Sequence, residues 1–353
     1  MDRIKQLVLP EVADGALITS DINRRYFTGM KSSAGMLLIF KECAYLIIDF
    51  RYIEKARNTV KNCTVMEQEN LTEQINSLMK KHNAKSLAVE SMDMTLSRMS
   101  FLEKKFPDIE FIKSDELSNN IYDMRTIKST EEIEKIHKAQ KIAEKAFDEI
   151  LGFIRPGVTE REIALKLDNC MLENGAEGLS FETIALAGAN TSMPHGVPGN
   201  YKVKNGDFVL MDFGAVYDGY HSDMTRTVCV GQPSEKMGKI YDIVLKAQLE
   251  ALKKVKSGIT GSELDGYARD IIDESGYGDF FGHSLGHGVG MEIHEFPTAS
   301  SKSETILKEN MVVTVEPGIY LPGEFGVRIE DFVVVTENSH QNLTNCPKKL
   351  IIL

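Results

Sequence analysis

The stretch Val209-Leu-Met-Asp-Phe-Gly214 returns 104 residues later, in altered form, as Val313-Thr-Val-Glu-Pro-Gly318. In both copies an apolar run leads to an acidic residue and then to a glycine. A second pair of segments, Arg155–Ile163 and Lys256–Leu264, matches at an offset of 101 residues, and each segment contains a Thr-x-x-Glu capping box that starts a helix. The repeat predicts two fused halves of about 100 residues, each built helix-helix-strand-strand. A site shared by the halves would lie on their pseudo-two-fold axis, where equivalent acidic residues converge.

Residues 1–125, upstream of the repeat, have the pattern of a smaller α/β domain. Charged segments with helical character separate short apolar runs that read as buried strands, namely Ala16–Thr19, Gly35–Phe40, Ala44–Asp49 and Ser86–Glu90. The capping box Ser129-x-x-Glu132 then starts a long amphipathic helix. Because single cores stop growing at about 250–300 residues, we expect two domains, residues 1–125 and 126–353, in an α+β protein.

The charge of the chain excludes some classes of partner. Lys and Arg number 41 and Asp and Glu number 52, so the net charge is -11. Such a balance argues against nucleic acids and anionic membranes, which need basic surface. Residues 1–125 hold 18 basic and 18 acidic residues, which leaves 23 and 34 for residues 126–353. The acidic excess of the second domain is either a solvated surface or a set of carboxylates that face inward onto cations.

The number of cysteines and the hydropathy of the chain indicate the cellular compartment of the protein. The five cysteines are odd in number and form no Cys-x-x-Cys pair, which is typical of a reduced cytosolic protein. No segment near the N-terminus has the apolar core of a signal peptide, and no apolar run approaches the ~18 residues that span a bilayer. We therefore expect a cytoplasmic protein that does not enter membranes.

Two acidic hairpins carry the chemistry. Asp212 and Asp223 flank the turn signal Asp218-Gly219, so they should lie nearly opposite each other on one face of a hairpin. Like charges at that spacing are destabilising, and either a raised pKa or a metal ion would relieve them. The second half adds Glu316, at the end of an apolar strand, and Glu330, within a predicted strand over 327–335. Two divalent cations would balance all four carboxylates, whereas one protonated pair would not.

A nitrogen ligand is expected within Phe281–His294, which holds three of the eight histidines. Its four glycines disfavour a helix, so His283 and His287 do not form a helical zinc motif, and the glycines instead allow the backbone to approach a ligand closely. His195 lies in a Pro/Gly-rich loop whose sequence resembles that around His287. For any one of these histidines an ordinary hydrogen-bonded role is the alternative.

Several local motifs together resemble the pita-bread dinuclear metallopeptidases, and within them Xaa-Pro aminopeptidase (aminopeptidase P) and Xaa-Pro dipeptidase (prolidase). The segment Asn23–Gly29 resembles the start of the creatinase-type N-terminal domain of these enzymes. The other motifs are His195-Gly-Val-Pro, Met211-Asp-Phe-Gly-Ala, His221-Ser-Asp-Met-Thr-Arg-Thr, Gly282-His-Ser-Leu-Gly-His-Gly-Val-Gly, Glu292-Ile-His-Glu, Val315-Glu-Pro-Gly and Val327-Arg-Ile-Glu-Asp. The resemblance implies a creatinase-like α/β domain followed by a pita-bread catalytic domain.

The resemblance also implies the site. Two divalent metal ions, manganese or alternatively cobalt, zinc or iron, would be held by Asp212, Asp223, His287, Glu316 and Glu330. Glu316 would also carry the proton between water and the leaving group. The implied substrate-binding residues are His195 and His294, which would also act catalytically on the scissile group, His283 on the proline side, and Arg328 beside the ligating carboxylates.

The implied reaction is hydrolysis of the Xaa-Pro bond at the N-terminus of a peptide by a hydroxide that bridges the two metals. The alternatives are an Xaa-Pro dipeptidase, a metal-free creatinase, and a peptide-binding pseudoenzyme of the same fold. The intact ligand set argues against the last two. A dipeptidase needs a group that recognises a free carboxylate near the scissile bond, and the sequence does not reveal one. The resemblance further implies a homodimer.

Overall fold

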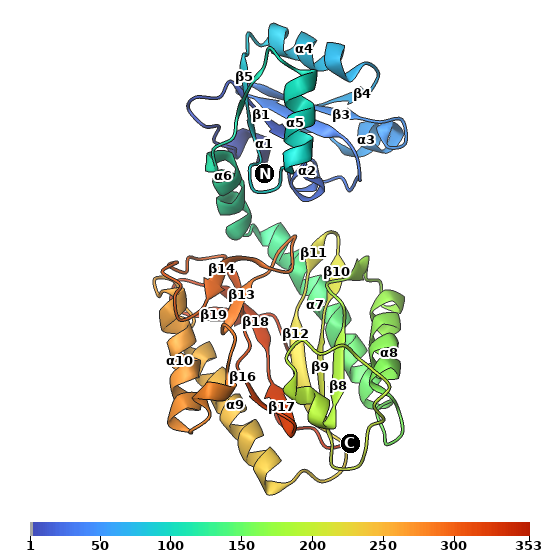
Figure 1. The fold of residues 1–353 in the computed structure, drawn as a ribbon, viewed down its shortest axis with the longest axis vertical. Helices are drawn as coiled ribbons and strands as arrows, with labels where there is room; N and C mark the ends of the chain where they lie inside the picture. Colours follow the sequence, from blue (N-terminus) through green and yellow to red (C-terminus); the bar gives the residue numbers. More distant parts are fainter. Residues whose placement is uncertain (1–2) are drawn as a thin grey trace. The chain divides into compact units, whose positions relative to one another are not determined.

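The computed structural model describes residues 3–353 and divides into two compact units, Met1–Arg125 and Thr126–Leu353 (Figure 1). Each unit has its own buried apolar core. In the part of the chain that is described, no helix combines the length and the hydropathy needed to cross a bilayer.

The N-terminal unit is a six-stranded sheet with helices. The order β4-β3-β2-β1-β5-β6 places the antiparallel pairs β1/β2 and β2/β3 at the centre, and parallel pairing adds β4, β5 and β6. Its strands are β1 (Gly15–Ile18), β2 (Met36–Phe40), β3 (Cys43–Ile48), β4 (Thr64–Glu67), β5 (Ser86–Val89) and β6 (Glu110–Ile112). Its helices are α1 (Arg3–Gln6), α2 (Asp21–Thr28), α3 (Ile53–Thr59), α4 (Leu71–Lys81), α5 (Leu96–Lys105) and α6 (Glu116–Thr126).

The four strands predicted in this unit are confirmed, because each is a continuous buried run. The sequence pattern missed β4 and β6, which form the two edges of the sheet. Their side chains are mostly exposed or half-buried, so neither strand shows the unbroken apolar run of a central strand.

The C-terminal unit consists of two halves with the predicted order of helices before strands. The first half contains α7 (Thr130–Leu151), α8 (Glu160–Glu173), β7 (Gly178–Leu179), β8 (Ile184–Ala187), the 3-10 turn η1 (Gly188–Ser192), β9 (Phe208–Phe213), β10 (Ala215–Tyr217), β11 (Tyr220–His221) and β12 (Met224–Cys229). The second contains α9 (Glu235–Lys254), α10 (Gly261–Glu274), η2 (Gly278–Phe280), β13 (Gly286–Gly288), β14 (Glu295–Ala299), β15 (Val312–Val315), β16 (Gly318–Leu321), β17 (Phe325–Arg328), β18 (Asp331–Val335) and β19 (His340–Asn342).

All three predicted capping boxes form, at Ser129, Thr159 and Thr260. Each cap satisfies amide groups that the first helical turn leaves without partners, so the helix starts at that residue. Within this unit the strands lie between α8 on one side and α9 with α10 on the other (Figure 1). Each pair of helices buries its apolar face on the strands of its own half.

The register of the first hairpin differs from the prediction. Asp218 and Gly219 form a tight two-residue turn with φ values of 47° and 83°, and Asp212 pairs with Thr225. The prediction that Asp223 lies opposite Asp212 is therefore wrong by two residues. Asp223 and Thr225 are two residues apart, so both carboxylates still share one face, with Asp223 placed diagonally.

The predicted single strand over 327–335 is also wrong, because it is broken at Ile329-Glu330. The segment before the break, β17, pairs with β16, whereas β18 pairs with β15 in another sheet. Glu330 therefore lies where the chain passes from one sheet to the next.

Candidate metal centre and active site

A cavity of about 550 Å³ lies in the C-terminal unit. All nine residues that the sequence nominated line it: His195, Asp212, Asp223, His283, His287, His294, Glu316, Arg328 and Glu330. Apolar side chains form another part of the wall, among them Phe181, Ile184, Val197 and Ile293. The cavity thus joins a polar, acidic floor to an apolar wall, an arrangement typical of sites that bind small organic ligands.

The four carboxylates reach the cavity from strand ends and strand breaks. Asp212 lies near the end of β9, and Asp223 immediately precedes β12. Glu316 separates β15 from β16, and Glu330 separates β17 from β18. The acidic residues of the two halves therefore converge, as the sequence repeat predicted.

His287, on β13, presents a bare nitrogen to these carboxylates. Its Nδ1 lies 3.0 Å from the carbonyl oxygen of Gly288. Because a carbonyl only accepts hydrogen bonds, Nδ1 carries the proton and Nε2 keeps its lone pair. Nε2 lies 3.5 Å from Oδ2 of Asp223 and 3.4 Å from Oε1 of Glu316. Burial lowers the pKa of His287, which favours this neutral form. A lone pair that faces carboxylate oxygens is stabilised by a cation between them.

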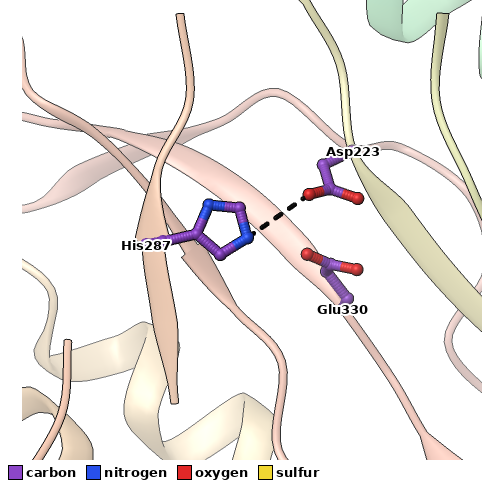
Figure 2. A group of neighbouring side chains, drawn as sticks. All are labelled: Asp223, His287 and Glu330. Atoms are coloured by element: carbon purple, nitrogen blue, oxygen red, sulfur yellow. Dashed lines mark ion pairs between the residues drawn. The ribbon is translucent and has the colours of Figure 1, made fainter. Parts of the chain in front are cut away.

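The donor set fits divalent metal ions. Asp223, His287 and Glu330 each offer one ligand atom, and these atoms all lie within 4.8 Å of one another (Figure 2). Oδ1 of Asp212 and Oε1 of Glu330 are buried and have no hydrogen-bond partner among residues 3–353. A buried carboxylate oxygen without a partner is costly unless a cation binds it. Carboxylates with one imidazole suit first-row transition metals.

Without a cation, the crowded carboxyls hold protons. Burial, and then the charges of Asp212 and Glu316, raise the pKa of Asp223 well above its ordinary value. Burial, and then the nearby carboxylates, do the same to the pKa of Glu330. Burial raises the pKa of Glu316 to about 8, although Arg328 opposes the change. Binding of metal ions to these carboxylates would therefore displace the protons that they hold in the metal-free protein.

Arg328 orders one side of the centre. Its guanidinium is buried and donates to Oδ2 of Asp212 at 2.5 Å, to the hydroxyl of Tyr320 at 2.8 Å and to that of Thr225 at 3.0 Å. Thr225 in turn donates to Oε2 of Glu330 at 2.8 Å. One arginine thus fixes carboxylates from both halves.

His283 is held by two bonds. Nδ1 donates to the carbonyl of Ser284 at 2.8 Å, so Nε2 is the acceptor for the Tyr320 hydroxyl at 2.9 Å. Burial lowers the pKa of His283 to about 4, so the ring is neutral. Both ring nitrogens have partners, and the ring therefore offers a substrate its surface and not a hydrogen bond.

His195 lies on an exposed loop that a buried carboxylate secures at both ends. Glu160, on α8, is 1% exposed. Its Oε1 accepts from the amide of Ala187 at 2.8 Å, and its Oε2 accepts from the amide of Gly199 at 3.0 Å. Glu160 therefore fixes the loop while His195 remains free to face the cavity.

His294 precedes a buried ion pair. Lys128 and Glu295 have side chains only 1% and 6% exposed, and Nζ lies 3.0 Å from Oε2. Oε1 of Glu295 also accepts from the amide of Glu292 at 3.0 Å. The rings of His294 and His287 meet edge to face with centroids 4.4 Å apart. The His294 segment is thus anchored beside the candidate metal ligands.

Sequence reasoning did not nominate Thr225, Glu160 or Tyr320. Thr225 lies two residues after Asp223, so the period of two in a strand could have identified it. Glu160 sits in the repeated capping segment, but nothing local shows that it reaches residues 27 to 39 positions away. No sequence signal marks Tyr320.

Comparison with known proteins agrees with the resemblance read from the sequence. Residues 134–337 match metallopeptidase family M24, and residues 1–127 match the Creatinase/Prolidase N-terminal domain. The Xaa-Pro dipeptidase of Pyrococcus horikoshii is 43% identical over 339 residues, which are 96% of this chain and 94% of that protein.

Solved structures of related enzymes resemble this chain in both sequence and fold. The Xaa-Pro dipeptidase from Bacillus anthracis superposes with a TM-score of 0.93 at 43% identity, covering 97% of this chain and 95% of that one. The X-Pro aminopeptidase from Thermotoga maritima gives a TM-score of 0.94 at 39% identity and covers 100% of both chains. The predicted α+β architecture, a creatinase-type domain followed by a pita-bread domain, is confirmed.

Proposed function

Because the chain belongs to metallopeptidase family M24, we propose that it is an Xaa-Pro aminopeptidase, which removes the first residue of a peptide when proline follows. The observation that carries the proposal is the bare Nε2 of His287, which faces Asp223 and Glu316 at 3.5 and 3.4 Å beside unpartnered buried oxygens. The names of similar proteins, which are dipeptidases and aminopeptidases for Xaa-Pro bonds, support the choice of bond.

Asp212, Asp223, His287, Glu316 and Glu330 would hold two divalent ions. Such ions supply an activated water at neutral pH and polarise the scissile carbonyl. Oxygen-rich ligation favours manganese, with cobalt, zinc and iron as alternatives.

Side chains of the protein would transfer the proton, bind the scissile group and hold the metal ligands in place. Glu316 takes the proton from the attacking water and passes it to the prolyl nitrogen that leaves. His195 and His294 are exposed to the cavity and hydrogen-bond the scissile group as negative charge develops on it. Arg328 keeps Asp212 in place, and the ring of His283 forms part of the wall for the proline.

The charge of the cavity favours an aminopeptidase. A dipeptidase binds a substrate whose free carboxylate lies close to the scissile bond, and a cationic side chain is the strongest partner for such a group. Arg328 is the only lysine or arginine that lines the cavity among the described residues, and Asp212, Tyr320 and Thr225 already engage it. Burial keeps His283 neutral at physiological pH. A longer peptide, whose carboxylate lies outside the cavity, is therefore the better substrate.

We also infer a cytoplasmic homodimer. The chain has an odd number of cysteines, five, and no Cys-x-x-Cys pair, which is typical of a protein in a reducing compartment. The dimer follows from the family resemblance alone, and sedimentation of the purified protein tests it.

The substrate test compares Ala-Pro with Ala-Pro-Ala for the metal-loaded protein, with alanine release as the readout. We expect faster cleavage of the tripeptide. Faster cleavage of Ala-Pro would establish the dipeptidase alternative, which the names of several relatives favour.

The metal test measures bound metal and repeats the assay with a chelator. We expect close to two ions per chain and loss of activity on chelation. Substoichiometric metal with chelator-insensitive activity would refute the metal mechanism, and metal binding without hydrolysis of any Xaa-Pro peptide would support the pseudoenzyme alternative.

A further inference from the structure

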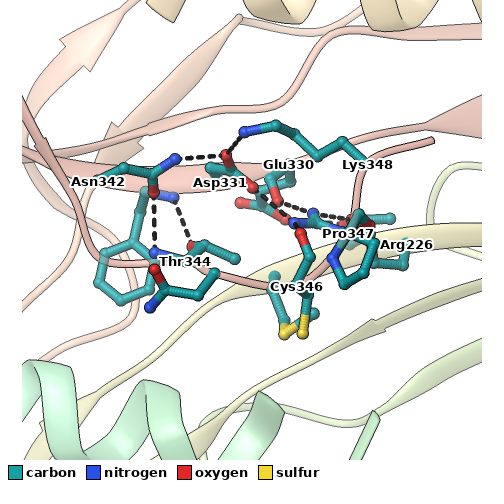
Figure 3. A network of polar contacts seen from close by, with 12 residues as sticks. Arg226, Glu330, Asp331, Asn342, Thr344, Cys346, Pro347 and Lys348 are labelled. Carbon is teal, nitrogen blue, oxygen red and sulfur yellow. Dashed lines mark hydrogen bonds and ion pairs between the residues drawn. The ribbon is translucent and has the colours of Figure 1, made fainter. Parts of the chain in front are cut away.

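Arg226 makes an unusually complete set of hydrogen bonds behind the candidate metal centre. The residue lies on β12 and is 1% exposed. An arginine has five N–H donors, and here five contacts account for them. The acceptors are the carbonyls of Thr225, Glu330, Cys346 and Pro347 and the carboxylate of Asp331 (Figure 3).

These contacts lie behind two candidate metal ligands, Asp223 and Glu330, which immediately precede β12 and β18. Asp223 and Thr225 point into the cavity side of the first strand, so Arg226 points the other way. Glu330, at the break just before β18, lines the cavity. Its neighbour Asp331, the first residue of β18, has Oδ1 2.7 Å from Nη2 of Arg226. Arg226 also donates to the main-chain carbonyl of Glu330 itself.

The contacts cross the boundary between the two repeat halves. Asp223 and Arg226 belong to the first half, and Glu330 and Asp331 belong to the second. The amide of Glu330 also donates to the carbonyl of Thr225 at 3.2 Å. Arg226 therefore joins β12, which Asp223 immediately precedes, to the start of β18, which Glu330 immediately precedes.

The C-terminal segment completes the network. Asn342 and Lys348 both donate to the second oxygen of Asp331, with the amide nitrogen of Asn342 at 2.7 Å. Cys346 and Pro347 accept from Arg226 at 2.9 and 3.0 Å. The last residues then pair with β12 through the carbonyl of Cys229, which accepts from the amide of Leu353 at 2.8 Å.

We propose that Arg226 is a positioning residue of the metal centre: together with Asp331 and the segment 342–348, it fixes the separation of Asp223 and Glu330. The proposal rests on the proposed metal site. The reason is geometric, because a metal pair tolerates little movement of its ligands and outer contacts of this kind set ligand orientation. A lysine at this position, with a single nitrogen, cannot replace the fork that reaches two strands and the C-terminal segment at once.

The test uses two variants of the full chain. R226K keeps the charge and loses the fork. R226M/D331L removes both charges, and replacing a buried ion pair by apolar residues of similar volume is often neutral for stability. Lys348 is 21% exposed and can turn to solvent when Asp331 is replaced. Circular dichroism identifies which variants fold, and either folded variant decides the question.

The readout is metal binding by protein freed of metal. Calorimetric titration with Mn²⁺ gives the affinity, and visible absorption with Co²⁺ reports coordination geometry. We expect about 10- to 100-fold weaker binding and a changed Co²⁺ spectrum in both variants. The matched control is R24K, which alters a buried arginine of the N-terminal unit that pairs with Asp21 at 2.6 Å and should leave both readouts unchanged.

Wild-type affinity and spectrum in a folded variant would overturn the proposal, as would an equal loss in R24K. A wild-type protein that binds neither metal refutes the proposed function itself, so the two failures are distinguishable.

Discussion

Removal of metal should make the stability of the protein fall as pH rises above neutrality. In the metal-free protein the pKa of Glu316 rises from 4.5 to about 8, chiefly through burial. The folded state then keeps a proton that the unfolded state has released. Its stabilising effect is complete below pH 4.5 and disappears as the pH rises to about 8. The raised pKa values of Asp223 and Glu330 act in the same direction.

The histidines set the lower limit of the pH range in which the carboxyl groups alone change the stability. The pKa of His283 falls from 6.5 to about 4, so its contribution is present above pH 6.5 and is lost as pH falls. The lowered pKa values of His287 and His294 act likewise. Histidines and carboxyls thus oppose each other below pH 6.5, and only the carboxyls act above it. From pH 6.5 to 8, Glu316 alone lowers the free energy of unfolding by about 2 kcal/mol, at ~1.4 kcal/mol per pH unit.

The assay is urea unfolding by circular dichroism at pH 6.5, 7.25 and 8, with chelator or with saturating Mn²⁺. The transition that shifts on adding metal belongs to the C-terminal unit. Bound metal keeps the carboxylates ionised, so the metal-loaded protein should show little pH dependence, and the stabilisation by metal should grow with pH. A flat or rising stability of the metal-free protein over this range, or equal slopes with and without metal, would refute the reasoning.

Three further predictions concern single residues. E316Q should lower kcat for Ala-Pro-Ala by 100-fold or more, as expected for a lost proton carrier, and a rate near that of wild type would exclude the role. E160Q should reduce kcat/KM by about 10-fold by loosening the His195 loop. E162Q is its control, because Glu162 lies at the exposed capping box of the same helix, where glutamine also fits, and it should leave the kinetics unchanged. K128M should destabilise the protein by about 3 kcal/mol or more because it breaks the buried ion pair with Glu295. K128M/E295Q should recover much of that loss in the same urea assay.

The repeat and its chemistry could be read from the chain because they depend on local patterns. Capping boxes at Thr159 and Thr260 act over three residues, so the sequence locates the helix starts directly. The acidic residues at strand ends and the glycine-rich histidine segment pointed to four carboxylates and three histidines that line the cavity.

The register of paired strands, and which strands belong to the same sheet, could not be predicted from local patterns. The pairing of Asp212 with Thr225 depends on where a two-residue turn centres, and a shift of one residue changes which side chains meet. The break at Glu330 reflects a change of sheet, for which the alternation of apolar residues gives no signal.

The sequence by itself determined the two-half architecture and the four carboxylates that make the centre acidic, because each follows from spacing or residue type. The choice of His287 as the nitrogen donor came from the family resemblance. Only the tertiary structure showed that Nε2 of His287 has a free lone pair, that both ring nitrogens of His283 are hydrogen-bonded, and that Arg226 joins the two halves. The physical reason is separation along the chain: Arg226 reaches Asp331 across 105 positions and Cys346 across 120, and contacts that distant exist only after both halves have folded.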